Sequence, residues 1–175
     1  MERMVKKRFD SKDVLIMLGL LAAIFILVGL SIFFLIGVLG QVMLAFLVIA
    51  GVVYGGFRLL TMRNLEFEYS FTNGYVSVDK IINRNSRKRL TAFECKEVEE
   101  IGAYEKNKTR LQNRELQSRI FASQYADGRD AWYVIVNAKK TGRTLLVFDP
   151  DEALLQAVKQ AIPSHLRFEV FGRNG

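Results

Sequence analysis

The sequence predicts a membrane α-helical hairpin joined to an α+β domain. Three observations predict this fold class. The run from Val14 to Phe57 contains no charged residue and no histidine, the region after Asn64 alternates apolar and polar residues, and a capped amphipathic segment begins at Asp149. A charge-free apolar run of about 18 residues or more is typical of a membrane-spanning helix. Alternation with a period of two is typical of a half-buried strand.

The charge-free run is too long for one passage through a bilayer. As a single helix it would measure about 65 Å at ~1.5 Å per residue, whereas the hydrocarbon core is ~30 Å thick. Residues 37–41 include two glycines, which interrupt helices and permit a reversal of the chain. We therefore predict a two-helix transmembrane hairpin over residues 14–60, with its turn at residues 37–41.

Basic residues flank the predicted hairpin at both outer ends, whereas the turn has none. Five Lys or Arg residues precede it in residues 1–13, and Arg58 and Arg63 lie at its end. Because positive charge is retained in the cytoplasm, we predict a multi-pass protein of the cell membrane with both termini cytoplasmic and a basic cytoplasmic N-terminal tail over residues 1–13. A cleaved signal peptide is the alternative, but the apolar run exceeds the length of a signal sequence and no typical cleavage site follows it.

Most of the excess positive charge lies beside the membrane. From Asn64 onward the chain holds 18 Lys or Arg and 15 Asp or Glu, only +3 of the net charge of +7. This distribution favours the anionic lipids of the inner leaflet as a partner and gives no support to nucleic acid.

Small residues recur at a spacing of four on both predicted helices, at Gly19 and Ala23 on the first and at Gly51 and Gly55 on the second. A turn near residue 38 would bring residues 19–23 level with residues 54–58. Small residues allow helix backbones to approach closely. We predict that these four residues pack helices together, within the hairpin or in a homodimer. The alternative is that they have no special role, since glycine is common in membrane helices.

The region after Asn64 begins with a strand pair. Residues 65–71 alternate apolar and polar side chains, residues 75–82 form the returning strand, and Asn73-Gly74 suits a type I′ turn, which needs a positive φ at both central residues. Residues 83–89 are predicted to be a polar loop, and residues 105–118 a long mobile loop or partly helical segment. Further strands are predicted at residues 90–94, 101–104, 119–124, 131–137 and 144–148.

A closing helix is predicted after the last strand. Asp149 suits the N-cap, Pro150 the first helical position and Glu152 the third. Apolar residues then recur at helical spacing until Pro163, and residues 165–171 are predicted to be a short extended tail. Several strands followed by one amphipathic helix indicate an α+β or capped-barrel domain.

Two segments resemble a known family. Residues 66–101, with Phe71-Thr72-Asn73-Gly74 and the basic run at residues 87–90, look like the bacterial pleckstrin-homology-like (PH-like) domains of small membrane proteins, and residues 146–155 are similar to their last strand and closing helix. The whole chain resembles uncharacterised two-helix membrane proteins of Gram-positive bacteria with such a domain. The resemblance implies a cytoplasmic PH-like domain over residues 64–175, built as a seven-strand, partly open β-barrel capped by one C-terminal helix. It implies no established activity.

The polar loop contains the strongest candidate for a binding site. Arg84, Arg87, Lys88 and Arg89 place four cations within six residues, which suits the phosphates of lipids or other anions. A solvated loop that adheres to the inner leaflet by charge alone is the alternative. Eukaryotic PH domains commonly bind phosphoinositides with their first hairpin loop, which is here the tight Asn73-Gly74 turn.

No catalytic or metal-binding pattern is present in the sequence. It lacks the phosphate-binding loop, the nucleophile elbow, the zinc-protease motif and the dinucleotide fingerprint. Cys95 is the single cysteine and His165 the single histidine, so a disulfide or a Cys-based zinc site within the chain is excluded. We predict no catalytic residues, no metal and no cofactor.

These observations together predict a non-enzymatic, membrane-anchored interaction module that presents a PH-like domain at the inner membrane surface. Its partner would be an unidentified protein or a second copy of the chain, besides the membrane lipids. Two alternatives stay open: a domain that senses anionic lipid or another anion through the residue 84–89 loop, and a small accessory subunit of a larger membrane complex.

Overall fold

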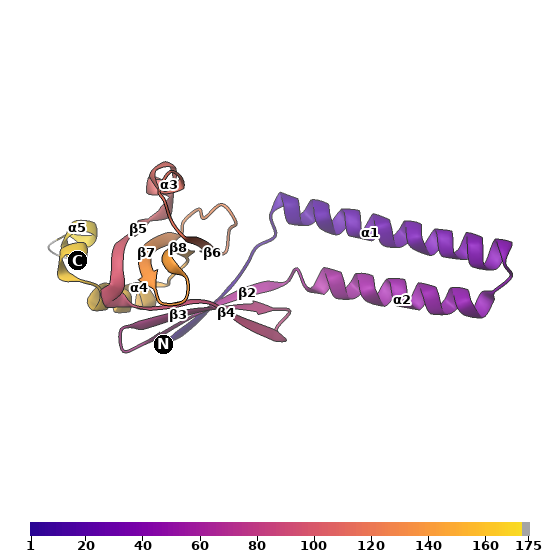
Figure 1. The fold of residues 1–175 in the computed structure, drawn as a ribbon, viewed down its shortest axis with the longest axis horizontal. Helices are drawn as coiled ribbons and strands as arrows, with labels where there is room; N and C mark the ends of the chain where they lie inside the picture. Colours follow the sequence, from indigo (N-terminus) through magenta and orange to yellow (C-terminus); the bar gives the residue numbers. More distant parts are fainter. Residues whose placement is uncertain (173–175) are drawn as a thin grey trace. The chain divides into compact units, whose positions relative to one another are not determined.

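The computed structural model describes residues 1–172, which divide into two compact units. One unit is residues 9–64, the helical hairpin. The other combines Met1–Arg8 with the chain from Leu65 onward. We predicted that the N-terminal segment is a separate tail. The structure differs from this prediction, because residues 2–6 form a strand of the domain. The hairpin is an insertion within the domain (Figure 1).

The hairpin consists of two antiparallel helices. Helix α1 (Ser11–Ser31) continues as a π-helical segment, η1 (Ile32–Val38), and α2 (Val42–Thr61) returns after a turn at which Gly40 has a φ of 65°. Helix α1 begins at a reciprocal cap, in which the Asp10 carboxylate accepts from the Asp13 N–H and the Asp13 carboxylate accepts from the Asp10 N–H at 3.4 Å. Both helices are long and apolar enough to cross a membrane.

The first sheet is antiparallel throughout, in the order β1-β2-β3-β4. Asn73 and Gly74 both have positive φ angles, of 50° and 79°, at the turn between β2 and β3. Strand β4 begins earlier than we predicted, at Ser86, because the chain reverses within residues 83–85. The basic residues 87–89 therefore lie on a strand rather than in a loop. The strands are β1 (Glu2–Lys6), β2 (Leu65–Thr72), β3 (Tyr75–Ile82) and β4 (Ser86–Glu94).

A short 3₁₀ turn, η2 (Cys95–Glu97), leads into the second sheet, whose order is β5-β7-β8-β6. Strand β6 runs parallel to β8, and the other pairs are antiparallel. Helix α3 (Tyr104–Gln112) occupies the first part of the segment in which we predicted a long mobile loop or a partly helical segment. Both ends of the helix pack against the domain, because Tyr104 near its start and Leu111 near its end are buried. The strands are β5 (Val98–Ala103), β6 (Ser118–Ala122), β7 (Trp132–Ala138) and β8 (Gly142–Phe148).

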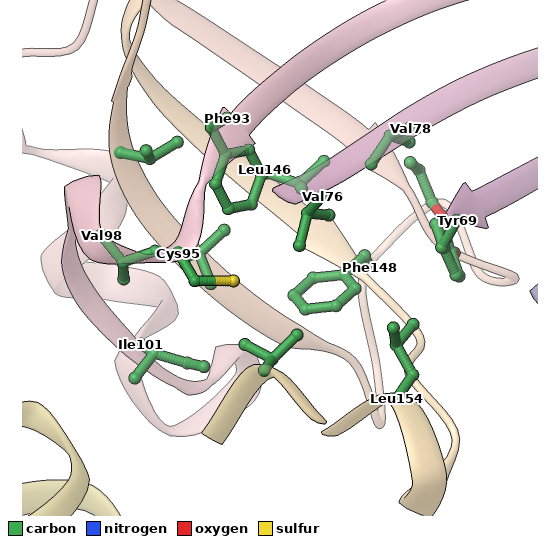
Figure 2. Close-up of a cluster of buried hydrophobic side chains, with 14 of the residues drawn as sticks. Tyr69, Val76, Val78, Phe93, Cys95, Val98, Ile101, Leu146, Phe148 and Leu154 are labelled. Atoms are coloured by element: carbon green, nitrogen blue, oxygen red, sulfur yellow. Dashed lines mark hydrogen bonds between the residues drawn. The ribbon is translucent and has the colours of Figure 1, made fainter. Parts of the chain in front are cut away.

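The two sheets enclose the core of the domain without closing into a barrel. Residues 1–172 contain eight strands in two sheets of four, instead of the seven-strand barrel implied by the resemblance, and the N-terminal β1 is one of the eight. Figure 2 shows Val76, Phe148 and Leu154 within one cluster of buried side chains. Truncating a buried phenylalanine such as Phe148 to alanine costs about 3–5 kcal/mol. Tyr69 joins the sheets by donating its hydroxyl to the Ala122 carbonyl.

Two helices follow β8 where one was predicted. The N-cap of α4 (Glu152–Ala161) is Asp151, which accepts from the Leu154 N–H at 2.8 Å. The predicted cap, Asp149, instead accepts from the backbone N–H of Gln124. Pro163 ends α4 but also starts α5 (Ser164–Phe171), which replaces the predicted extended tail. The Phe171 ring stacks on Trp132 at 5.4 Å between centroids, and this burial favours the helix.

Candidate functional site

The candidate residues of β4 lie over a row of carboxylates on one face of the first sheet. The register sets Glu68 opposite Asp79, and Asp79 opposite Arg89. Arg89 donates to both oxygens of Asp79, at 2.7 and 3.1 Å. Arg87 donates to Glu68. Arg84, in the turn before β4, donates to Glu66 at 3.2 Å. We call these three ion pairs the arginine ladder.

The arginine ladder covers carboxylates that are almost completely buried. The side chains of Glu66, Glu68 and Asp79 are only 7, 8 and 7% exposed. A buried carboxylate needs a charged or hydrogen-bonding partner, because transfer from water without one is very unfavourable. The hydrogen bond from Arg89 holds the pKa of the Asp79 carboxyl below its usual value. An anion that bound these arginines would compete with the carboxylates for the same donors.

Lys88 points away from the arginine ladder, because neighbouring residues of a strand face opposite sides of the sheet. The register sets it opposite Lys80 of β3, which in turn lies opposite Phe67 of β2. Phe67 belongs to the buried core. The four predicted residues are therefore divided between the two faces of the sheet: three arginines on the outer face, and Lys88 on the face that turns toward the core.

A pocket of about 440 Å³ opens on that inner face, between the first sheet and β6. We call it the β2–β6 pocket. Among the residues of 1–172 that line it, none is acidic. Its apolar wall consists of Leu65, Phe67, Leu90, Ile120 and Phe121. The basic residues among its lining are Lys7, Lys80 and Arg119, and the guanidinium of Arg119 donates to backbone carbonyls at the end of α3. A volume of this size lies within the range of small-molecule sites, about 300–1,000 Å³.

The sequence analysis did not identify the β2–β6 pocket, although one signal for it was present. In residues 75–82 the core-facing positions are Val76, Val78, Lys80 and Ile82. A lysine at a position where the alternation requires an apolar residue indicates a core face that opens to water or to a ligand. The part of the pocket that β6 contributes could not be assigned, because this strand lies about 40 residues further along the chain.

The chain matches one known protein family. The family model described as Bacterial PH-like domain (DUF6106) matches residues 1–168. The chain belongs to this family. The match includes both β1 and the helical hairpin, in agreement with a PH-like domain that contains the hairpin as an insertion. No curated protein and no solved structure is significantly similar to the chain.

A second charged cluster of the PH-like domain joins α3 to β5. Arg110, Arg114 and the hydroxyl of Tyr133 all donate to the Glu100 carboxylate. Burial disfavours the charged carboxylate, but these three donors outweigh it and lower its pKa. Arg143 pairs with the neighbouring Glu99 at 2.8 Å. The basic and acidic stretches of this part of the sequence therefore balance each other.

The predicted helix-packing residues do not form the contact between α1 and α2. A Cβ atom added at Gly19, Gly51 or Gly55 would meet nothing within 4 Å, and Ala23 is exposed. The close approach is instead at the next residue along the helix, where a Cβ atom on Gly56 would lie 2.2 Å from the Ile24 side chain. Packing of Gly19, Ala23, Gly51 and Gly55 against a second chain stays a prediction.

The remaining chemically notable groups are buried or isolated. Cys95 lies inside the core (Figure 2), and burial raises the pKa of its thiol to about 11. The thiol is therefore protonated at neutral pH, when it is a poor nucleophile. Within residues 1–172 no group of three or more His, Cys, Asp or Glu side chains is placed to hold a metal ion.

Proposed function

We propose that this protein is a non-enzymatic, membrane-anchored interaction module that presents its PH-like domain at the inner surface of the cell membrane. The match to the PH-like family over residues 1–168 supports this proposal, because PH-like domains are generally binding modules without catalytic activity. Two helices long enough and apolar enough to cross a membrane support the anchoring.

The observation that carries the proposal is the insertion of the hairpin between two neighbouring strands. The Lys7 N–H donates to the Leu65 carbonyl at 2.9 Å, so the chain leaves the domain and returns to it at adjacent points. Only Arg8, Phe9 and Asp10 separate this point from α1, and only residues 62–64 separate α2 from β2. Two short connections restrict a domain more than one flexible linker does. This suits a module whose task depends on a fixed distance from the bilayer.

The orientation in the proposal rests on the basic residues that flank the hairpin. Lys6, Lys7, Arg8 and Lys12 precede or begin α1, and Arg58 and Arg63 lie at the end of α2, whereas the turn has no charge. The positive-inside rule therefore favours a cytoplasmic domain. Arg63 also pairs with Asp13 at 2.6 Å, which joins the two helix ends of the hairpin.

Thiol labelling in intact cells tests this orientation. Gln41 lies at the hairpin turn and Asn85 in the turn before β4, and both are exposed. With a membrane-impermeant reagent, we expect Gln41→Cys to react in intact cells and Asn85→Cys only after permeabilisation. The wild-type chain is the control, because Cys95 is buried. Labelling of Asn85→Cys in intact cells would contradict the proposed placement.

An accessory role in a larger complex is the second candidate. It is supported by the open space around Gly51 and Gly55, since small residues that are not used within a hairpin suit close packing against another helix. Purification in a mild detergent, followed by mass measurement of the particle, tests it. Recovery of the isolated chain, unaffected by Gly55→Leu, would count against this role.

A further inference from the structure

Strand β6 of the PH-like domain has an open edge. It stands at the end of the second sheet, where it runs parallel to β8. Successive residues of a strand direct their backbone N–H and C=O groups to alternate sides. The Gln117 N–H donates toward β8, to the Arg143 carbonyl at 3.0 Å. The Ala122 carbonyl points the other way and accepts the Tyr69 hydroxyl of the first sheet. The even-numbered residues of β6 therefore turn their backbone groups away from β8.

Ile120 is the central residue of this open edge. By the same alternation, its N–H and its carbonyl point away from β8, and within residues 1–172 no second strand pairs with β6. Unpaired N–H and C=O groups along an edge strand are a template for a further strand from another chain. Such an added strand gains affinity from main-chain hydrogen bonds and specificity from the spaces that receive its alternate side chains.

The β2–β6 pocket lies along this edge. It is lined by Arg119, Ile120 and Phe121, three consecutive residues whose side chains alternate between the two faces of the second sheet. Ile120 packs against the main core, whereas Phe121 lies on the α3 side, where its ring contacts Tyr104 edge to face at 5.8 Å between centroids. A cavity lined from both faces of one strand follows the edge of that strand. The space of about 440 Å³ is therefore placed where an added strand would lie.

The first sheet forms the opposite wall of this space. Leu65, Phe67 and Leu90 give it an apolar surface, and Lys80 lies among them at a core-facing position. Lys80 forms no ion pair within residues 1–172, and none of the described residues that line the pocket is acidic. An entering segment therefore meets apolar side chains together with positive charge. Charge complementarity favours a segment with apolar side chains and an acidic one.

Two other edges of the domain are less suited to this role. Strand β4 carries Arg87, Lys88 and Arg89, and charged side chains protect an edge strand against pairing. On β5, the Ala103 carbonyl already accepts from the Asn107 side chain at 3.1 Å. The cavity beside β5 is also lined by charges of both signs. Among the described residues, β6 combines an open edge with an apolar wall and charge of one sign.

Chain connectivity places the β2–β6 pocket near the ends of the hairpin helices. Leu65, in the pocket, follows Thr61, the last residue of α2, by four residues, and Lys7, also in the pocket, precedes Ser11 of α1 by four. Four extended residues span at most about 14 Å. If the helices cross the membrane as proposed, a chain segment that leaves the bilayer beside the hairpin lies within reach of the pocket.

We infer that the β2–β6 pocket binds an extended, membrane-proximal segment of a partner membrane protein, which pairs with β6 as an added strand. The N–H and carbonyl of Ile120 bind the backbone of this segment. Its inward side chains lie against Phe67 and Leu90, and an acidic one among them pairs with Lys80. The inference names a partner class for the interaction module and rests on the proposed function only for the membrane origin of that partner.

Amide hydrogen exchange of the full chain in a neutral detergent tests the pairing. The probe is a synthetic six-residue peptide of alternating valine and glutamate with blocked ends. Because a hydrogen-bonded amide exchanges slowly, we expect the peptide to slow exchange at Ile120 at least tenfold. Exchange at Ile101, in the edge strand β5, should change less than twofold. Equal protection of the two amides, or no protection of Ile120, would overturn the inference.

A second peptide separates strand pairing from contact through side chains alone. It has the same sequence, but every backbone nitrogen is methylated, so it has no main-chain donor and cannot approach the edge closely. We expect it to slow exchange at Ile120 less than twofold. Protection equal to that of the unmethylated peptide would overturn the added strand.

Charge reversal tests the position of Lys80. We expect Lys80→Glu to weaken binding of the valine–glutamate peptide at least tenfold and to strengthen binding of a valine–lysine peptide, measured by the fluorescence anisotropy of labelled peptides. The matched control Lys140→Glu, at the exposed β7–β8 turn, should change both affinities less than twofold. Equal changes in the two variants would indicate long-range attraction and overturn the site. If Lys80→Glu does not fold, Lys80→Gln gives the same test with an expected loss of about threefold.

Other occupants of the pocket would be visible in the same exchange experiment. Protection of Ile120 by dihexanoyl phosphatidylglycerol alone would assign the pocket to a lipid. Protection that rises with protein concentration, without peptide, would assign it to a second copy of the chain. Either result would overturn the inference. The labelling of Asn85→Cys does not depend on these measurements, so a failure of peptide binding leaves the proposed placement of the domain unaffected, and a failure of the placement leaves the pairing at β6 unaffected.

Discussion

Both faces of the first sheet carry positively charged side chains. Those on the outer face are paired with carboxylates, whereas those on the inner face lie opposite each other. On the outer face, Arg87 and Arg89 are paired with buried carboxylates. On the inner face, Lys88, between them in the sequence, faces another lysine. Three consecutive basic residues therefore divide into two arginines paired with carboxylates and one lysine that lies opposite another lysine. The difference teaches that a basic run on a strand has to be separated by face before it is interpreted as a binding site.

The largest effect on stability is expected at Arg89, whose guanidinium binds a buried carboxylate. Replacing Arg89 by methionine leaves the Asp79 carboxylate buried without its two donors. We expect Arg89→Met to lower the free energy of unfolding by about 2–3 kcal/mol. Urea unfolding of the full chain in neutral detergent, followed by Trp132 fluorescence, measures this. Lys140→Met, at the exposed turn between β7 and β8, is the control, with an expected change within about 0.5 kcal/mol. A loss below 0.5 kcal/mol for Arg89→Met, within about the range of the control, would show that the ladder is not structural.

The pH dependence of that loss gives a sharper test. Arg89 lowers the folded-state pKa of Asp79, so the pair stabilises the wild-type protein above the unfolded pKa of about 3.9 and loses its effect as the pH falls through the lower, folded pKa. Without Arg89, burial favours the protonated carboxyl. We therefore expect the deficit of Arg89→Met to be largest near pH 7 and to shrink by about 1–2 kcal/mol near pH 3. Urea titrations at both pH values check this, and a deficit independent of pH would assign the loss to packing.

On the inner face, we expect removal of a cation to change the free energy of unfolding in the opposite direction. Replacing Lys88 by glutamine removes the repulsion from Lys80, so the ligand-free protein should become more stable by about 0.2–1 kcal/mol at low ionic strength. The gain should disappear in high salt, which screens exposed charges. The same urea experiment at two salt concentrations measures it, with Lys140→Gln as the neutral control. A clear loss of stability in Lys88→Gln would remove the distinction between the faces.

The smallest effect is expected at the end of the arginine ladder. Arg84 is 78% exposed and makes a single contact of 3.2 Å with Glu66. Such a pair contributes little, because water screens it. We expect Arg84→Gln to lower the free energy of unfolding by about 0.5 kcal/mol, measured as for Arg89→Met. A loss as large as that of Arg89→Met would mean that burial of the carboxylate, and not exposure of the arginine, decides the energy of each pair.

Sequence by itself determined the elements that depend on neighbouring residues. The helix pair follows from the absence of charge over residues 14–57, and the β2–β3 turn follows from Asn73-Gly74, whose positive φ angles few other residues tolerate. The resemblance to PH-like domains also rested on local motifs, and the family match over residues 1–168 confirms it. These features were predictable because their causes lie within a few residues of each other.

Only the tertiary structure decided which residues of distant segments lie opposite each other. The pairing of residues 2–6 with residues 66–70 joins segments separated by the whole hairpin, so no local pattern could show that the N-terminal segment is a strand. The same holds for the candidate site. Its basic residues were visible in the sequence, but Arg87 and Arg89 are neutralised by Glu68 of β2 and Asp79 of β3, whereas Lys88 lies opposite Lys80. A charge is available for binding only if no distant residue already satisfies it, and that depends on the packing of the whole domain.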